Sequence, residues 1–175
     1  MMRRRLAAVT LILAAAVCGQ SALLACGDKF FLVGRGDRFA RAYASLYPGR
    51  IVIYTGGSSP TGKALNDGRL QKYFTRAGHR VSLAEDAAAL EKALAAGDVD
   101  LVIAGLQEAH DLVPRVQGTN SRTTLVPVAD DKRAARASEH QFAATLRASD
   151  KITGFLAKVE TIMKSRAATA PRPTT

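Results

Sequence analysis

The chain is poor in cysteine and in aromatic residues and has no tryptophan. Of its 175 residues, two are cysteines and 6% are aromatic. Cys18 lies in an N-terminal segment that we expect to be removed, so the mature protein has one thiol and no intramolecular disulfide. Few aromatic side chains also disfavour a binding face of stacked rings. Stability must come from a buried core, for which a single domain of about 150 residues is sufficient.

Acidic residues are absent from the first 25 positions. Three arginines at positions 3–5 precede an apolar run at 6–17, and Leu23-Leu24-Ala25-Cys26 follows. A basic start, a short apolar stretch and small residues before a cleavage site are typical of an export signal. The apolar run is too short for a transmembrane helix. We therefore expect residues 1–25 to be a signal peptide and the mature chain to be exported, to the periplasm or the outer surface.

The end of this segment allows two cleavage products. Leu23-Leu24-Ala25-Cys26 resembles the lipobox of bacterial lipoproteins, which implies a diacylglycerol on the sulfur of Cys26, although Leu24 stands where a smaller residue is commoner. Ordinary signal peptidase would instead cut after Ala25 and leave Cys26 as a free thiol. Lipidation would attach the protein firmly to a membrane, because each buried acyl CH₂ contributes about 0.8 kcal/mol.

Acidic residues are also in the minority elsewhere. Without the three leader arginines, 22 basic residues face 15 acidic ones, which leaves a net charge of +7. The basic residues are dispersed, as on solvated helix faces, and contact with anionic lipid or surface polymers is the functional alternative. Export disfavours nucleic acid as a partner, because genomic DNA is not expected outside the cytoplasm.

From residue 50 onward, short β-branched runs alternate with helical patterns. This alternation predicts an α/β fold with a doubly wound, five-stranded parallel sheet covered by helices on both faces. Right-handed crossovers permit the three-layer, flavodoxin-like strand order 2-1-3-4-5. The predicted strands span residues 51–54, 80–84, 99–104, 123–128 and 141–146. The predicted helices span residues 66–77, 85–96, 107–116, 130–140 and 152–163, and we expect Pro114 to shorten or kink the third of them.

Two segments flank this domain, which we place at residues 50–166. Residues 26–49 are expected to form an N-terminal extension with a strand at 30–33 and a helix at 37–46. Residues 167–175 contain alanine, proline, arginine and threonine without apolar periodicity, so we expect a disordered tail.

The order and lengths of these elements, with the stretch from His79 to Leu106, resemble the receiver domain of bacterial response regulators. The resemblance covers residues 50–166 and rests on topology. It implies a crevice at the carboxyl ends of the first and third strands, where receivers bind Mg²⁺ and phosphorylate an aspartate.

The residues that this chemistry needs are missing at the matching positions. The acidic pair falls near Tyr54 and Thr55, the nucleophile on Gly105, the hydroxyl near Ala129 and the lysine near Arg147. We therefore expect a crevice without carboxylates, which holds no metal or cofactor and accepts no phosphoryl group.

Other residues with potential chemistry are scattered. Asp100 or Asp111 would serve as nucleophile only in another alignment register, because the first begins the third predicted strand and the second lies well beyond its end. His79, His110 and His140 share no metal-ligand spacing with one another, with cysteine or with acidic residues. With no catalytic constellation in the sequence, we expect a protein that is not an enzyme.

The segment Gly57-Ser58-Ser59-Pro60-Thr61-Gly62-Lys63 matches the GxxxxGK pattern of a P-loop. Ala64 replaces the serine or threonine that would hold Mg²⁺, and no predicted strand ends in a Walker B aspartate, which disfavours nucleotide hydrolysis. A flexible loop rich in turn-forming residues is the simplest interpretation. A small-anion site is the alternative, and its candidate residues are Gly57, Ser58, Ser59, Gly62, Lys63 and Arg147.

The sequence favours a membrane-anchored, non-catalytic interaction module of receiver-like fold, without a phosphoacceptor. Receivers dock partners through the face of the fourth helix and fifth strand. The resemblance implies a basic partner face here, suited to an acidic envelope protein, with Lys132, Arg133, Arg136 and His140. The alternative function is an envelope protein that binds a small molecule or anion at the loop of residues 56–63.

Overall fold

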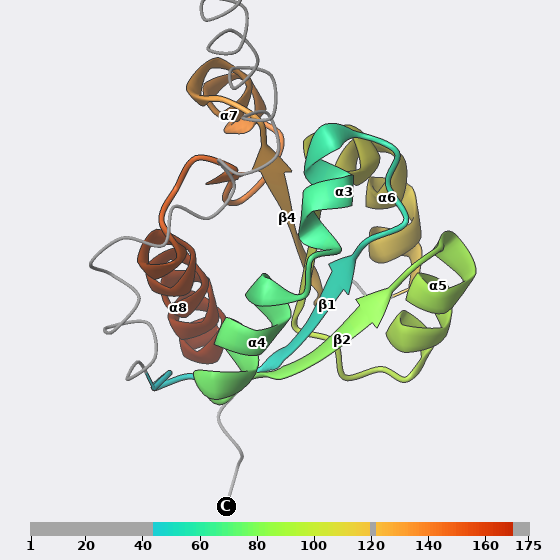
Figure 1. Cartoon of the computed structure of the whole chain (residues 1–175). Helices are drawn as coiled ribbons and strands as arrows, with labels where there is room; N and C mark the ends of the chain where they lie inside the picture. Colours follow the sequence, from blue (N-terminus) through green and yellow to red (C-terminus); the bar gives the residue numbers. More distant parts are fainter. Residues whose placement is uncertain (1–43, 120–121, 170–175) are drawn as a thin grey trace, which may run out of the picture.

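The structure is a computed structural model that describes residues 44–119 and 122–169. Five strands form one sheet in the order β2-β1-β3-β4-β5, and every neighbouring pair is parallel (Figure 1). This arrangement confirms the predicted flavodoxin-like α/β fold. The strands are β1 (Arg50–Tyr54), β2 (Arg80–Ala84), β3 (Leu101–Gly105), β4 (Thr124–Ala129) and β5 (Leu146–Arg147).

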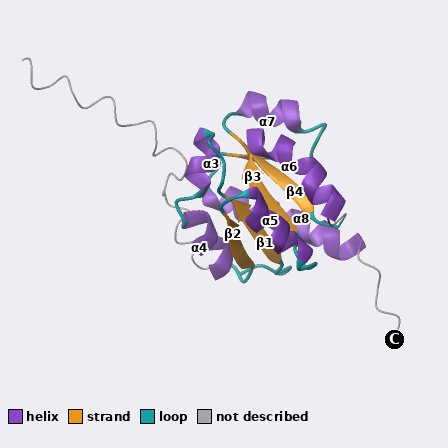
Figure 2. Cartoon of the chain, turned by 90° about the vertical axis from the view of Figure 1, so that its right-hand side faces the viewer, coloured by secondary structure: helices purple, strands orange, loops and turns teal. Residues whose placement is uncertain are grey.

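Helices cover both faces of the sheet (Figure 2). They are α3 (Pro60–Leu65), α4 (Arg69–Arg76), α5 (Ala87–Ala95), α6 (Leu106–Thr119), α7 (Lys132–Ser138) and α8 (Ile152–Thr169). Helices α4 and α8 pack on one face, and α5 and α6 pack on the other. Along β3, Leu101 and Ile103 face the first pair of helices, whereas Val102 and Ala104 face the second. Burial on both faces explains why this strand is a continuous apolar run.

Local signals in the sequence set several helix ends. Asp86 caps α5 by accepting a hydrogen bond of 2.7 Å from the N–H of Ala89. Gly78 and Gly97 follow α4 and α5 with φ angles of +100° and +83°. Glycine adopts this left-handed conformation without steric cost, so both residues end their helices.

The predicted start of the helix at residues 66–77 was wrong. The structure has two helices, and α3 begins at Pro60 inside the segment that we interpreted as a loop. Ser59 caps it through a 2.9 Å hydrogen bond from the N–H of Gly62 to Ser59 Oγ, and Pro60 occupies the first turn. Serine at the cap and proline directly after it favour a helix start. Gly57 and Gly62 are typical of turns, which favoured the interpretation as a loop.

Two further boundaries differ from the prediction. Residues 141–145 are not a strand, because Gln141 and Phe142 turn back to donate hydrogen bonds to the carbonyl of Ser138. The fifth strand consists of Leu146–Arg147 alone. Pro114 does not end α6, which continues to Thr119 and is held against the sheet by buried side chains on both sides of the proline.

The flanking segments agree only in part with expectation. Ala44–Leu46 is not helical, and the N–H of Ser45 donates to the carbonyl of Ala77 at 2.8 Å. Helix α8 runs to Thr169, past the predicted start of the tail at 167. The signal peptide, Cys26, the strand at 30–33 and the rest of the helix at 37–46 lie outside the described residues. Within the described residues, none of the helices has both the length and the apolar character needed to span a bilayer.

Candidate functional site

At the carboxyl ends of β1 and β3, the segment after β1 meets the first turn of α6. The N–H of Ser59 donates to Glu108 Oε1 at 3.1 Å, and Ser59 Oγ donates to Glu108 Oε2 at 2.9 Å. The same Ser59 Oγ accepts the capping hydrogen bond from Gly62. One serine therefore joins α3 to α6 through a carboxylate.

Three glycines make room for this carboxylate. A Cβ atom on Gly57 would lie 2.3 Å from Glu108 Oε1, and one on Gly105 would lie 2.3 Å from Glu108 Oε2. A Cβ atom on Gly62 would lie 3.1 Å from Oε1. Gly105 ends β3, at the position that matches the receiver nucleophile. The absence of side chains at these positions creates the space that Glu108 occupies.

The expectation of a crevice without carboxylates was wrong. In addition to Glu108, Asp130 lies at the end of β4 and accepts a hydrogen bond from Thr61 Oγ1. Asp130 is exposed overall, but partial loss of its solvation raises its pKa, and the negative charges of Asp131 and Glu108 raise it further. Glu108 is not aligned with any acidic residue of a receiver, because it reaches the crevice from the helix that follows β3.

These carboxylates are engaged by hydroxyl groups of the protein. The described residues contain no group of three or more histidine, cysteine, aspartate or glutamate side chains placed to hold a metal ion. At the positions of the receiver acidic pair, Thr55 Oγ1 donates to the carbonyl of Ala84 at 3.3 Å, and Tyr54 packs on the face of α5 and α6.

The structure brings together only part of the predicted anion site. Gly57, Ser59 and Gly62 surround the Glu108 carboxylate, so the N–H and O–H groups of Ser59 are already used by an anion of the chain itself. Ser58 and Lys63 are exposed.

Arg147 belongs to a different cluster. It forms an ion pair of 2.6 Å with Asp150, which also pairs with Lys158 at 3.0 Å. Burial alone would raise the pKa of Asp150, but the hydrogen bonds from Arg147 and Lys158 and their positive charges hold it below its usual range. The carboxylate stays ionised and fixes β5 to α8.

The predicted partner face lies on and directly after α7. Lys132, Arg133, Arg136 and His140 are all exposed, while Ala135 and Ser138 face inward. Figure 1 places α7 beyond the arrowhead of β4, at the carboxyl edge of the sheet. The exposed acids Asp130, Asp131 and Glu139 lie among these basic residues in the sequence, so the face has mixed charge.

Comparison with known proteins finds similarity in fold only. No family model matches the chain, and no curated protein matches it. One similar structure is a fusion of the yeast Spc42 trimeric coiled coil, amino acids 181–211, to another protein, with 18% identity, a TM-score of 0.50 and coverage of 73% of this chain and 86% of that one. A second is described as a CpaE2 pilus assembly protein from Sinorhizobium meliloti, with 16% identity, a TM-score of 0.39 and coverage of 65% and 98%.

Proposed function

We propose that the protein is an exported, membrane-anchored, non-catalytic interaction module of receiver-like fold. The observation that supports this most strongly is at the end of β3. Gly105 stands where receivers have the phosphoaccepting aspartate, and the Glu108 carboxylate fills the space that a side chain on Gly105 would need.

Glu108 is itself poorly placed to act as a nucleophile. In-line attack on a phosphoryl donor needs a carboxylate oxygen that is open to the donor and a charge-neutralising partner beside it. Each Glu108 oxygen instead accepts a hydrogen bond from Ser59. We infer that this carboxylate has a structural task, which is to hold the segment after β1 against α6.

The partner in this proposal is an acidic envelope protein that contacts α7. The face offers three exposed cationic side chains, Lys132, Arg133 and Arg136, on one short helix. An anchor at Cys26 would keep this face near the membrane in which the partner resides. The anion-binding alternative has less support, since Glu108 already occupies the donors of Ser59 and Arg147 pairs with Asp150.

A phosphorylation assay tests the non-catalytic part. We expect incubation of the mature chain with Mg²⁺ and either acetyl phosphate or beryllofluoride to leave its intact mass and its amide NMR spectrum unchanged. A receiver domain with a complete set of acidic residues serves as the positive control. A stable acyl-phosphate adduct on this chain would contradict the proposal.

Site-specific crosslinking tests the partner face. A photoreactive residue introduced at position 133 or 136 should crosslink one envelope protein in intact cells, and the same residue at position 69 on α4 should not. Charge reversal by Arg136→Glu should reduce the crosslink from position 133. Equal yields from positions 69 and 133, or no effect of charge reversal, would argue against α7 as the docking face.

A further inference from the structure

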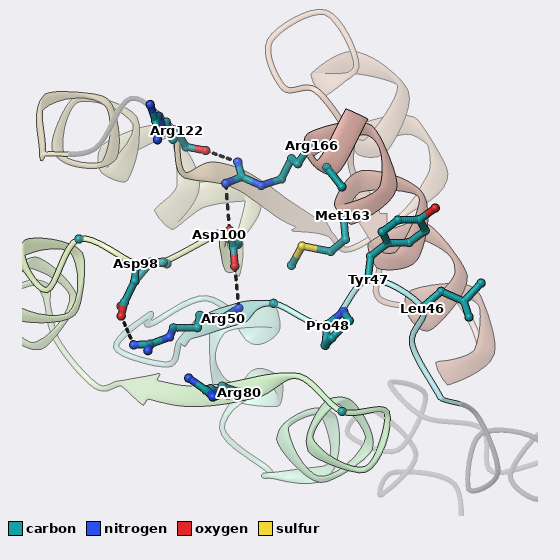
Figure 3. Close-up of a pocket in the computed structure, with 15 residues that line it drawn as sticks. Leu46, Tyr47, Pro48, Arg50, Arg80, Asp98, Asp100, Arg122, Met163 and Arg166 are labelled. Carbon is teal, nitrogen blue, oxygen red and sulfur yellow. Dashed lines mark hydrogen bonds and ion pairs between the residues drawn. The ribbon is translucent and has the colours of Figure 1, made fainter. Parts of the chain in front are cut away.

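A second surface lies at the opposite edge of the sheet, where the strands begin. A cleft of about 900 Å³ is formed there by the segment before β1, the start of β2, the loop before β3 and the end of α8 (Figure 3). No residue of α7 lines it, so it is separate from the proposed partner face.

Positive charge predominates in this cleft. Four arginines line it, Arg50, Arg80, Arg122 and Arg166, against the two carboxylates of Asp98 and Asp100. Both carboxylates are already used, because Asp98 pairs with Arg50 and Asp100 accepts from Arg166 Nη2 at 3.1 Å and from the N–H of Arg50 at 2.8 Å. The arginines that line the cleft therefore outnumber its carboxylates.

Arg80 is the most available of these cations. Arg50 and Arg80 are direct partners in the register of β1 and β2, and adjacent strands lie only about 4.8 Å apart. Like charges placed side by side in this way repel each other. Asp98 forms an ion pair with Arg50 and neutralises its charge. Arg80 is exposed and forms no ion pair with any side chain that the structure describes. A carboxylate between the two arginines would relieve this repulsion.

The space beside Arg80 extends in two directions. A smaller cleft of about 340 Å³ along β1, β2 and α5 is also lined by Arg50, Arg80, Asp98 and Val99, so the two clefts meet at these residues. On the other side, Leu46 is 83% exposed and is the one large hydrophobic side chain left exposed among the described residues. Tyr47, Pro48 and Met163 extend this apolar wall.

We propose that this cleft binds an acidic, extended peptide segment of a partner protein, with a carboxylate on Arg80 and an apolar side chain on Leu46. A charge mismatch disfavours the chain's own segment 26–43, which has four basic and two acidic residues. A flat anionic bilayer fits less well, because the cleft is recessed. This inference is independent of the partner face on α7.

Fluorescence anisotropy with a labelled Glu-Glu-Leu-Glu-Glu peptide tests the inference on the mature chain. We expect saturable binding, binding about tenfold weaker for Arg80→Gln, consistent with loss of one charge-assisted hydrogen-bonded contact, and a smaller loss for Leu46→Ser. Arg69→Gln on α4 is the matched control, because Arg69 is exposed and lines neither cleft, and it should bind like the wild type. A Gln-Gln-Leu-Gln-Gln peptide should not bind.

Amide NMR provides a second readout that does not depend on the variants. Peptide-induced shifts should concentrate at residues 46–50, 80 and 97–100. An unchanged affinity for Arg80→Gln, no binding of the acidic peptide, or a loss caused by Arg69→Gln instead would overturn the inference. So would Arg80-dependent binding to phosphatidylglycerol vesicles without binding to the peptide. None of these results would alter the α7 crosslinking outcome, so the two proposals fail separately.

Discussion

Glu108 shows how one residue can change the chemistry of a whole crevice. Glycine-rich segments after a strand have N–H groups that can surround the oxygen atoms of an anion. Here the N–H and O–H groups of Ser59 point at a carboxylate from the same chain, and glycines at positions 57, 62 and 105 leave space for it. The segment that resembles a ligand-binding loop is therefore part of the protein's own packing.

Gly105→Ala should lower the free energy of unfolding. Its new methyl group would lie 2.3 Å from Glu108 Oε2 and 3.1 Å from Ser59 Oγ, and overpacking of this kind costs about 1–3 kcal/mol. Gly118→Ala in α6 is the matched control, because nothing lies within 4 Å of its Cβ position, and alanine there should be neutral or stabilise by up to about 1 kcal/mol. Urea denaturation measures both variants.

A double-mutant cycle identifies which side chain opposes the new methyl group at position 105. If Glu108 is the obstacle, Gly105→Ala should cost clearly less in a Glu108→Ala background than in the wild type. The same cost in both backgrounds would mean that some other contact opposes the methyl group.

His79 makes the stability depend on pH. It is only 3% exposed, its Nδ1 accepts from the N–H of Gly49 at 3.2 Å, and its ring lies edge-on to Phe74. Burial lowers the pKa of His79, although the negative charges of Glu160 and Asp100 oppose the shift. Below the unfolded pKa of about 6.5, the unfolded chain takes up a proton that the folded protein resists, so stability falls as the pH falls.

The free energy of unfolding should therefore decrease between about pH 7 and about pH 5, and His79→Gln should remove part of this slope. His140→Gln, at an exposed position, should keep the slope of the wild type. Urea denaturation at a series of pH values measures it. A His79→Gln slope identical to that of the wild type would show that other groups cause the dependence.

At the scale of elements, the short β5 depends on its connection to α8. The strand has two residues, and Asp150 joins Arg147 at its end to Lys158 on the helix. Lys158 Nζ also donates to the carbonyl of Thr145 at 3.3 Å. One carboxylate thus fixes the edge strand of the sheet to the longest helix that the structure describes.

Asp150→Asn should cost about 1–3 kcal/mol at neutral pH, because two cations lose their anion. The lowered pKa of Asp150 means that its contribution is present above about pH 3.9 and is lost as the pH falls through the folded value. The difference from the wild type should therefore narrow in acid. Glu91→Gln, in the exposed pair with Arg115, should cost at most about 1 kcal/mol. Equal costs for the two variants would contradict this role of Asp150.

The elements that were predicted correctly have signals within their own sequence. Strands β1, β3 and β4 are apolar runs because both faces of the sheet are covered there, whereas the edge strand β2 alternates between exposed and more buried residues. The ends of α4 and α5 are set by Gly78 and Gly97. Helix α3 was missed and the bounds of strand β5 were wrong, because both elements are too short for a periodic pattern. The Glu108 contact could not be predicted, since it joins three segments whose approach only the folded sheet determines.

At the scale of the whole molecule, the two edges of the sheet differ in chemistry. Hydroxyl groups bind the carboxylates at the carboxyl edge, whereas arginines outnumber carboxylates in the cleft at the amino edge. In the proposed function, the chain N-terminal to β1 connects this body to a membrane.

Replacing Cys26 with serine tests the anchor. The wild-type protein should fractionate with membranes and show a mature N-terminus that carries diacylglycerol at Cys26, whereas Cys26→Ser should be released, because at least two acyl chains are needed for stable attachment. Mass spectrometry of the N-terminus and cell fractionation measure both. A wild-type chain that begins with an unmodified Cys26 would favour the free-thiol alternative.

The carboxylate that fills the crevice has a consequence for regulation. A protein that supplies its own anion does not depend on a phosphate donor, and the envelope is not expected to maintain a pool of such donors. Under the proposed function, the shape of α7 is the same in starved and growing cells. The cell would then control this scaffold by how much of it is made and where it is placed.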